Sequence, residues 1–187
     1  IFRKWVLQDL IGVSTLPFDE IIDFLVRTCD IQPKVTIHRD FHCRNLLLKS
    51  DGTIGAVDFQ DALVGPISYD LASILYDCYY QFPDATIATS IARYLQLARN
   101  AGHPLTNCEE DFTRELEITA VQRQLKAVGI FARLKLKHDR ASHLENIVPV
   151  MRRVCELMTK HPELSECAEW LETKTLGPIR EAVARLR

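Results

Sequence analysis

Hydrophobic residues in the early part of the chain recur at the spacing of a helix. From residue 16 to about residue 30, the apolar side chains Phe18, Ile21, Ile22 and Leu25 repeat every three or four positions, which is typical of a helix with one buried face. A proline and two acidic residues at the beginning of this segment favour a helix start there. The pattern predicts a helix that packs its apolar side against a core.

The same helical spacing dominates the second half of the chain. We predict helices over residues 68–82, 84–101, about 108–138, 147–160 and 163–174, and a last piece from Pro178. Pro149 and Pro162 are interpreted as markers of helix starts, because proline disrupts a helix interior but is tolerated in the first turn. This part of the sequence therefore predicts a helical bundle.

Short strands are predicted between the first helix and this bundle. Residues 35–37 form an apolar strand, and residues 46–49 and 54–57 flank an Asp-Gly turn, the strongest short-range signal for a β-hairpin. A hairpin brings its two ends together, so Asn45 and Asp58 are predicted to face each other across its open end. Residues 61–66 are predicted to form a loop. The fold class is therefore α+β: a short β element buttressed by helices.

Length and composition fit a folded globular domain. The chain has 187 residues, of which 47% are hydrophobic and 26% charged, enough for one core or one lobe of a larger enzyme. No apolar run is long enough to cross a bilayer, and six scattered cysteines without a C-x-x-C pair fit a reducing compartment. A net charge of −2 gives no footprint for nucleic acid. We expect a cytoplasmic protein that binds neither nucleic acid nor membranes.

The candidate chemistry is concentrated in residues 38–45, HRDFHCRN, and in the later Asp58-Phe59. Kinases use an H-x-D-x-x-x-x-N loop and a following Asp-Phe element at their catalytic centre. Asp40, at the end of a strand, can orient an acceptor hydroxyl and take its proton. Asn45 and Asp58 supply an amide and a carboxylate oxygen, which suit Mg²⁺. The sequence therefore predicts a phosphotransferase.

Three segments together resemble the aminoglycoside phosphotransferase family, which shares the protein-kinase-like fold. They are residues 38–46, 57–62 and 65–72, with the sequences HRDFHCRNL, VDFQDA and GPISYDLA. Protein kinases proper are less similar, because Gln60 and His42 stand where they have glycine and lysine. The resemblance implies ATP and Mg²⁺ as cofactors, Asp40 as catalytic base, Asn45 and Asp58 as Mg²⁺ ligands, and contact of His42 with the transferring phosphoryl group.

A narrower likeness extends to residues 2–5, 122–133 and 161–164, with the sequences FRKW, QRQLKAVGIFAR and HPEL. These are similar to the branch that contains the bacterial cell-wall amino-sugar kinases. That resemblance implies phosphorylation of N-acetylmuramate and N-acetylglucosamine at the anomeric hydroxyl, in peptidoglycan recycling. Two alternatives stay open: an antibiotic-inactivating aminoglycoside phosphotransferase, and a non-catalytic pseudokinase or interaction module.

The position of the motif predicts the domain organisation. The catalytic loop arrives by residue 38, and the sequence contains no G-x-G-x-x-G turn, which kinases carry in a β-rich lobe before that loop. We therefore expect residues 1–187 to be the C-terminal catalytic and substrate-binding lobe, with the N-terminal nucleotide lobe upstream and outside this chain.

Supporting residues have two possible interpretations each. Asp70 stands in the first turn of a predicted helix, where it suits the helix dipole, or it reaches back to backbone N–H groups of the loop and with His38 supports it. Residues 114–140 contain seven basic and three acidic residues, a net charge of +4. If this segment borders the substrate cleft, its charge disfavours a polycationic aminoglycoside and suits a neutral or carboxylate-bearing sugar. Arg123 and Lys126 are candidate sugar contacts, or members of a solvated helix face.

Overall fold

The computed structural model describes residues 1–103, 105 and 108–186. The chain divides into two compact units, one formed by Ile1–Val26 with Val121–Arg187 and the other by Arg27–Ala120. Helices α1 (Leu16–Asp30) and α4 (Glu109–His138) each contribute to both units. The fold mixes helices with short strands, as predicted, and the strands form two small sheets. The candidate chemistry of residues 38–70 lies entirely in the second unit.

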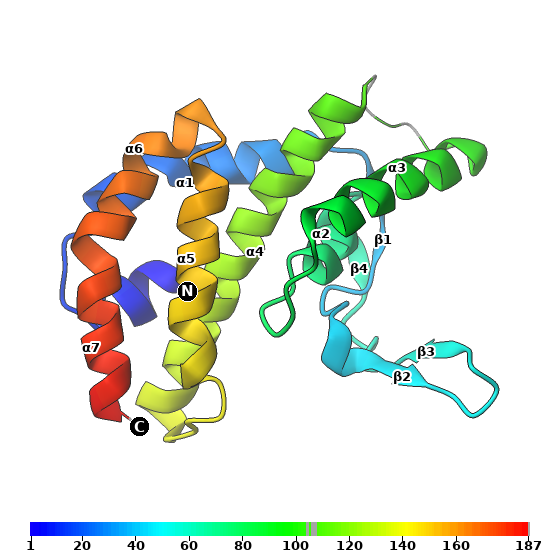
Figure 1. Cartoon of the computed structure of the whole chain (residues 1–187). Helices are drawn as coiled ribbons and strands as arrows, with labels where there is room; N and C mark the ends of the chain where they lie inside the picture. Colours follow the sequence, from blue (N-terminus) through cyan, green and yellow to red (C-terminus); the bar gives the residue numbers. More distant parts are fainter. Residues whose placement is uncertain (104, 106–107, 187) are drawn as a thin grey trace. The chain divides into compact units, whose positions relative to one another are not determined.

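Two antiparallel strand pairs build the second unit (Figure 1). The predicted hairpin is present as β2 (Leu46–Leu48) and β3 (Ile54–Ala56). The prediction of a loop over residues 61–66 is wrong, because β4 (Leu63–Pro66) pairs along its whole length with β1 (Lys34–Ile37). A Gly-Pro pair indicates a turn when read locally, but a strand in a two-stranded sheet has a free edge, and an edge strand tolerates proline at its end.

Helices α2 (Tyr69–Leu75) and α3 (Asp84–Asn100) complete the second unit. The helix predicted over residues 68–82 is too long, since α2 ends at Leu75 and Tyr76 leaves the helical conformation with φ −112° and ψ 43°. A buried polar cluster fixes the start of α2. The Ser68 hydroxyl donates to Gln32 Oε1 at 2.5 Å and lies 2.9 Å from Thr119 Oγ1.

The first unit is helical. It contains the π-helix η1 (Arg3–Gln8), and α5 (Leu144–Met158) packs against α6 (Pro162–Trp170) and α7 (Leu176–Leu186). In Figure 1 these three helices, coloured yellow to red, lie side by side. Its largest fully buried side chains come from η1, α5, α6, η3 and α7: Leu7, Leu144, Ile147, Met151, Met158, Leu164, Leu171 and Ile179.

Two prolines do not start helices in the way the sequence suggests. Pro149 lies inside α5, which begins five residues earlier at Leu144. The π-helix η3 (Leu171–Thr175) joins α6 to α7, and Pro178 is the third residue of α7 rather than the start of a separate piece.

Within the described residues, every helix is too short or too polar to span a bilayer.

Gly129 on α4 is a point of close approach within the first unit. A Cβ added there would lie 2.7 Å from the backbone nitrogen of Phe2 and 2.6 Å from Ile1 Cγ2. Because backbone must move to make room, we expect Gly129→Ala to destabilise the protein by about 1–3 kcal/mol. The melting temperature should fall by roughly 2–12 °C.

Gly177 in α7 is the matched control for this substitution. A Cβ at Gly177 would meet nothing within 4 Å outside its chain neighbours. Gly177→Ala should be close to neutral, because its gain in helix propensity is offset by the restriction that Pro178 places on the residue before it. Thermal unfolding followed by circular dichroism compares the two variants. Equal shifts in melting temperature would contradict the close approach at Gly129.

Candidate active site

Two residues of the predicted motifs hold strained backbone. Arg39 has φ 75° and Asp58 has φ 67°, and the third non-glycine residue with positive φ among those described is Asp139. Residues other than glycine rarely adopt the left-handed region, and such conformations concentrate at functional sites. Two of these three residues therefore lie in the segments that carry the candidate chemistry.

Asp70 holds the start of the loop. One carboxylate oxygen accepts the backbone N–H of His38 at 2.6 Å, and the other accepts the N–H of Arg39 at 3.0 Å. Two charge-assisted hydrogen bonds to consecutive amides fix the backbone that leads into Asp40. The Asp70 side chain thus makes the long-range contact that the sequence left open.

His38 connects this end of the loop to the segment before Asp58. Its Nε2 lies 2.9 Å from the carbonyl oxygen of Val57, and because a carbonyl only accepts, Nε2 carries the proton and donates. The His38 ring also meets the Phe41 ring edge-on, with centroids 5.8 Å apart. His38 therefore ties β1, the loop and the end of the hairpin together.

Asn45 lies between Asp40 and Asp58. Its side-chain amide donates to the backbone oxygen of Asp40 at 2.8 Å and is 3.4 Å from Asp58 Oδ2. The backbone oxygen of Asn45 accepts the N–H of Val57 at 3.0 Å, which continues the ladder of the hairpin. Asn45 and Asp58 are therefore neighbours at the open end of the hairpin, with Asn45 Oδ1 left as an acceptor.

The carboxylates of Asp58 and Asp40 have different surroundings. Asp58 Oδ1 accepts a hydrogen bond from Gln60 Nε2 at 2.7 Å. Asp40 is half-buried, and within the described part of the chain no hydrogen bond engages its side-chain carboxylate. An unengaged carboxylate can accept a proton from an incoming hydroxyl.

The oxygen atoms of Asn45 and Asp58 suit a cation that takes its remaining ligands from water or from a bound phosphate. Among the described residues, no group of three or more His, Cys, Asp or Glu side chains is arranged to hold a metal ion. Asn45 and Asp58 together offer an amide and a carboxylate oxygen, the hard donors that Mg²⁺ prefers, while water and phosphate oxygens usually complete its shell. The residues present therefore fit Mg²⁺ bound together with a phosphate group.

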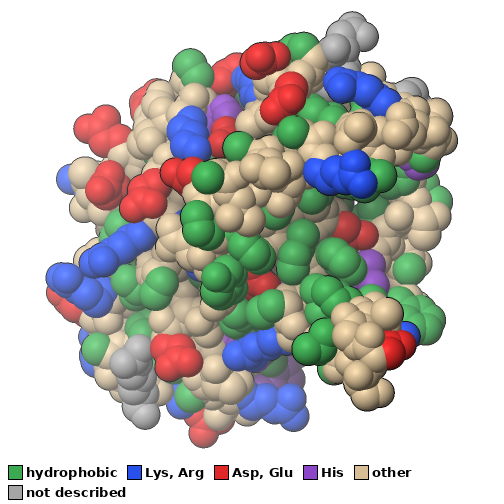
Figure 2. Space-filling view, turned by 45° about the vertical axis from the view of Figure 1, so that its right-hand side comes forward, with side chains coloured by type: hydrophobic (Ala, Val, Ile, Leu, Met, Phe, Trp, Pro, Cys, Tyr) green, Lys and Arg blue, Asp and Glu red, His purple; other side chains and the backbone are tan. Residues whose placement is uncertain are grey.

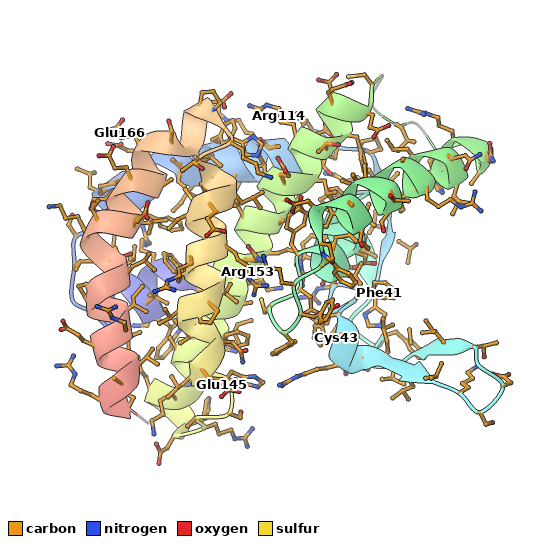
Figure 3. The ribbon with its side chains drawn as sticks, viewed as in Figure 1. Phe41, Cys43, Arg114, Glu145, Arg153 and Glu166 are labelled. Carbon is orange, nitrogen blue, oxygen red and sulfur yellow. The ribbon has the colours of Figure 1, made fainter. Side chains whose placement is uncertain are left out.

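The second half of the loop is held by residues that the motifs do not include. Asp77, 1% exposed, accepts the N–H of Cys43 on Oδ2 and the N–H of Tyr79 on Oδ1, each at 2.8 Å. The Tyr79 ring lies 3.8 Å from the Arg44 guanidinium carbon and meets the His42 ring with centroids 5.7 Å apart. Figure 3 shows Cys43 where the loop enters the hairpin. The only local signal for these contacts in the sequence is the spacing of Asp77 two residues before Tyr79, so the motifs did not predict them.

Cys43 is exposed, yet its thiol is held in the neutral form. Burial of the sulfur and the neighbouring Asp77 carboxylate raise the pKa of Cys43 to about 11. Because the thiolate is the nucleophile, alkylation at pH 8 should be about a hundredfold slower than for an ordinary thiol, and the rate should climb as pH rises toward the pKa.

Iodoacetamide labelling with peptide mapping checks this expectation. The same protein unfolded in urea provides the reference rate for Cys43, since unfolding separates the sulfur from Asp77. Native labelling as fast as labelling in urea at pH 8 would contradict it.

Arg123 and Lys126 lie on the part of α4 that belongs to the first unit, whereas the loop belongs to the second unit. Both are half-buried, so neither stands on a fully solvated helix face. Lys126 lines a pocket of about 560 Å³ together with Gln122 and the residues Ile1, Phe2, Arg3, Phe18, Ile22, Leu25, Val26 and Leu125. Their role as sugar contacts stays a prediction.

Residues 5–105 match the phosphotransferase enzyme family. The matched region covers more than half of the chain and contains the whole site described above. The chain belongs to the phosphotransferase enzyme family. The matched region includes the site residues Asp40, Asn45 and Asp58. It also includes Asp70 and Asp77, which bind the backbone of the loop.

Curated relatives place the chain beside named members of this family. It is 36% identical over 182 residues to the N-acetylmuramate/N-acetylglucosamine kinase of Pseudomonas aeruginosa, covering 95% of this chain and 54% of that protein. It is 38% identical over 171 residues to the protein of the same name from Neisseria meningitidis, covering 88% of this chain and 51% of that protein. The Pseudomonas putida protein of that name is 31% identical over 182 residues, with coverage of 95% and 53%.

This phosphotransferase chain spans about half the length of the curated relatives it matches. The predicted resemblance to the aminoglycoside phosphotransferase family and its amino-sugar kinase branch is confirmed at the level of family and relatives.

Proposed function

We propose that the protein transfers the γ-phosphoryl group of ATP to a hydroxyl of an N-acetylated cell-wall amino sugar. The observation that carries this proposal is the hydrogen-bonded arrangement of Asp40, Asn45 and Asp58 in a member of the phosphotransferase enzyme family. The relatives named N-acetylmuramate/N-acetylglucosamine kinase support the acceptor class. In this proposal Mg²⁺ and ATP are cofactors and the protein acts in the cytoplasm.

Asp40 is proposed to act on the acceptor. Its carboxylate makes no hydrogen bond within the described part of the chain, so it is available to orient a sugar hydroxyl and accept its proton as the oxygen attacks. The two amides held by Asp70 fix the backbone of residues 38 and 39. Positioning of this kind is the main contribution a protein makes to phosphoryl transfer.

Asn45 and Asp58 are proposed to hold Mg²⁺ through Asn45 Oδ1 and the Asp58 carboxylate. The bound Mg²⁺–ATP supplies the phosphoryl group and neutralises the charge that develops on it. Gln60 holds one Asp58 oxygen and Asn45 lies beside the other, which keeps the carboxylate oriented in the absence of a cation. His42 is proposed to contact the transferring phosphoryl group from the middle of the loop.

The described fold is proposed to act as the C-terminal, kinase-like lobe of a larger protein. The apolar side chains Leu48, Ile54, Phe59 and Val64 around the hairpin and β4 are between 66% and 79% exposed, and apolar side chains are visible on the surface in Figure 2. Exposed apolar side chains mark binding sites where they lie together. Phe59 directly follows Asp58 in the chain, and its exposure supports a nucleotide-binding lobe that contacts this segment.

The charge of residues 114–140 supports a sugar over a polycationic antibiotic as the acceptor if this segment borders the substrate. Five of the seven basic residues over residues 114–140 are half-buried: Arg114, Arg123, Arg133, Lys126 and Lys135. Partly buried positive charge repels a polycation more strongly than solvated charge does, because water screens it less. Contact of Arg123 and Lys126 with the sugar remains part of this proposal.

A coupled assay of ADP release by the intact protein tests the proposal. N-acetylmuramate and N-acetylglucosamine should be phosphorylated, whereas hexoses and kanamycin-type aminoglycosides should turn over much more slowly. Preferred turnover of an aminoglycoside would overturn the acceptor assignment. Absence of Mg²⁺-dependent nucleotide binding would overturn the enzymatic assignment in favour of a pseudokinase.

A further inference from the structure

The catalytic loop is held by two carboxylates, one at each end. Asp70 accepts the amides of His38 and Arg39, and Asp77 accepts the amide of Cys43. Both acids come from α2 and the segment directly after it, seven residues apart. The catalytic motif and the family resemblance account for the first contact but contain nothing that corresponds to the second.

We infer that Asp77 is a positioning residue that sets the conformation of the second half of the loop and thereby the place of Asn45. This inference rests on the proposed function, in which Asn45 holds Mg²⁺. Asp77 itself lies outside the set of Asp40, Asn45 and Asp58. Its effect on the reaction is exerted through the backbone of residues 43–45.

The geometry requires a carboxylate at this position. Each oxygen of Asp77 accepts a different backbone N–H at 2.8 Å, and the side chain is 1% exposed. A buried carboxylate is costly unless its oxygens are hydrogen-bonded, and these charge-assisted bonds are among the stronger ones in proteins. Asparagine has only one side-chain oxygen. In Asp77→Asn the NH₂ group would therefore face one of the two backbone N–H groups, and two donors cannot form a hydrogen bond.

The contact reaches Asn45 through a single helical turn. Cys43 is the first residue of the 3₁₀-helix η2 (Cys43–Asn45), and the N–H of Asn45 closes this turn on the oxygen of His42 at 2.9 Å. The side-chain amide of Asn45 then reaches Asp40 and Asp58. A displacement at Cys43 therefore turns Asn45 away from Asp58.

Tyr79 adds a second contact between Asp77 and the loop. Asp77 fixes the backbone N–H of Tyr79, and the Tyr79 ring packs against the guanidinium of Arg44 and the ring of His42. A cation–π contact at 3.8 Å is within the range in which the attraction is significant. Asp77 thus positions three consecutive loop residues, one by a hydrogen bond and two through Tyr79.

Hydrogen exchange of the intact protein without nucleotide or sugar tests the contact directly. In Asp77→Asn the amide of Cys43 should exchange about tenfold to a hundredfold faster, while the amides of His38 and Arg39, held by Asp70, keep their protection. Asp84→Asn, the same chemical change at an exposed position of α3, should alter none of the three. Unchanged exchange at Cys43 in Asp77→Asn would overturn the inference.

Kinetics test the consequence for Asn45. Asp77→Asn should lower kcat and raise the Mg²⁺ concentration for half-maximal activity by about tenfold, with the KM for the sugar unchanged. A variant that had only lost stability would show a smaller active fraction and an unchanged Mg²⁺ dependence, and that result would overturn the inference. Because exchange is measured without substrates, a wrong acceptor assignment leaves the exchange result valid.

Tyr79→Leu provides a second variant should Asp77→Asn fail to fold. Tyr79 is half-buried, and leucine keeps its backbone N–H while removing the ring. Cys43 should keep its protection, whereas kcat should fall and the Mg²⁺ requirement should rise. If this variant has the kcat and the Mg²⁺ dependence of the wild type, Tyr79 does not carry the effect of Asp77 to the loop, and the inference is overturned.

Discussion

Replacement of Asp40 by asparagine is expected to lower kcat by about a thousandfold while the melting temperature stays unchanged. Asparagine has nearly the shape of aspartate but cannot take a proton from the attacking hydroxyl. The fold should not respond, because within the described residues no hydrogen bond depends on the Asp40 carboxylate. The Asp40 backbone oxygen, which accepts the side-chain amide of Asn45, is kept in the variant.

Steady-state kinetics of ADP release, together with thermal unfolding, measure this result in the intact protein. Asp30→Asn is the matched control, since Asp30 is 82% exposed and makes only a surface ion pair with Lys34. Such pairs contribute little to stability, so this variant should retain wild-type turnover. Wild-type kcat in Asp40→Asn would remove Asp40 from the role of catalytic base.

Local sequence patterns were sufficient for the parts of the fold that depend on neighbouring residues. The Asp-Gly turn between two apolar runs defines the hairpin β2–β3, and the apolar spacing from Phe18 to Leu25 defines α1. These features arise from interactions a few residues apart, which a sequence displays directly. The proximity of Asn45 and Asp58 follows from the same hairpin.

The strand β4 and the early end of α2 depend on contacts far away in the sequence. Gly65 and Pro66 favour a turn locally, but β4 pairs with β1, whose residues lie about thirty positions earlier. A side chain at position 65 would collide with that of Ile37, so the pairing also explains the glycine. Neither effect is visible in a local window of sequence.

Asp77 shows why part of the candidate site could not be found from motifs. Its partner Cys43 lies 34 residues earlier, and no spacing rule connects an acid after a helix to that amide. The helical spacing of Leu75 and Cys78 favours a continued helix over this segment. The structure instead ends the helix at Leu75 and uses Asp77 to bind the loop. Packing of the loop thus overrides the local preference of the segment.

The charge of residues 114–140 could be counted from the sequence, but the burial of the charged side chains could not. The sequence allowed Arg123 and Lys126 to be solvated, but both are half-buried. A half-buried cation keeps more of its electrostatic effect than a solvated one. Burial therefore gives these two charges a larger electrostatic effect than the sequence alone indicates.

Replacement of Asp58 by asparagine is expected to produce a second large loss, with a different signature from that at Asp40. Asn tolerates the left-handed conformation that Asp58 adopts at φ 67°, so the backbone can be kept. The lost charge weakens the proposed Mg²⁺ site, and kcat should fall by roughly a hundredfold to a thousandfold at ordinary Mg²⁺ concentrations. Excess Mg²⁺ should recover part of this loss, whereas it should not rescue Asp40→Asn.

Nucleotide binding separates the two roles without turnover. Titration calorimetry of the intact protein with ATP should show that Mg²⁺ strengthens binding in the wild type and in Asp40→Asn, and that this strengthening is lost in Asp58→Asn. Asp51→Asn in the exposed turn of the same hairpin is the matched control, since Asp51 bonds only to Thr53 and should leave the Mg²⁺ effect intact. If Mg²⁺ strengthens ATP binding equally in Asp58→Asn and the wild type, then Asp58 is not a ligand of the cation, and Asn45 beside it loses the partner on which its own assignment depends.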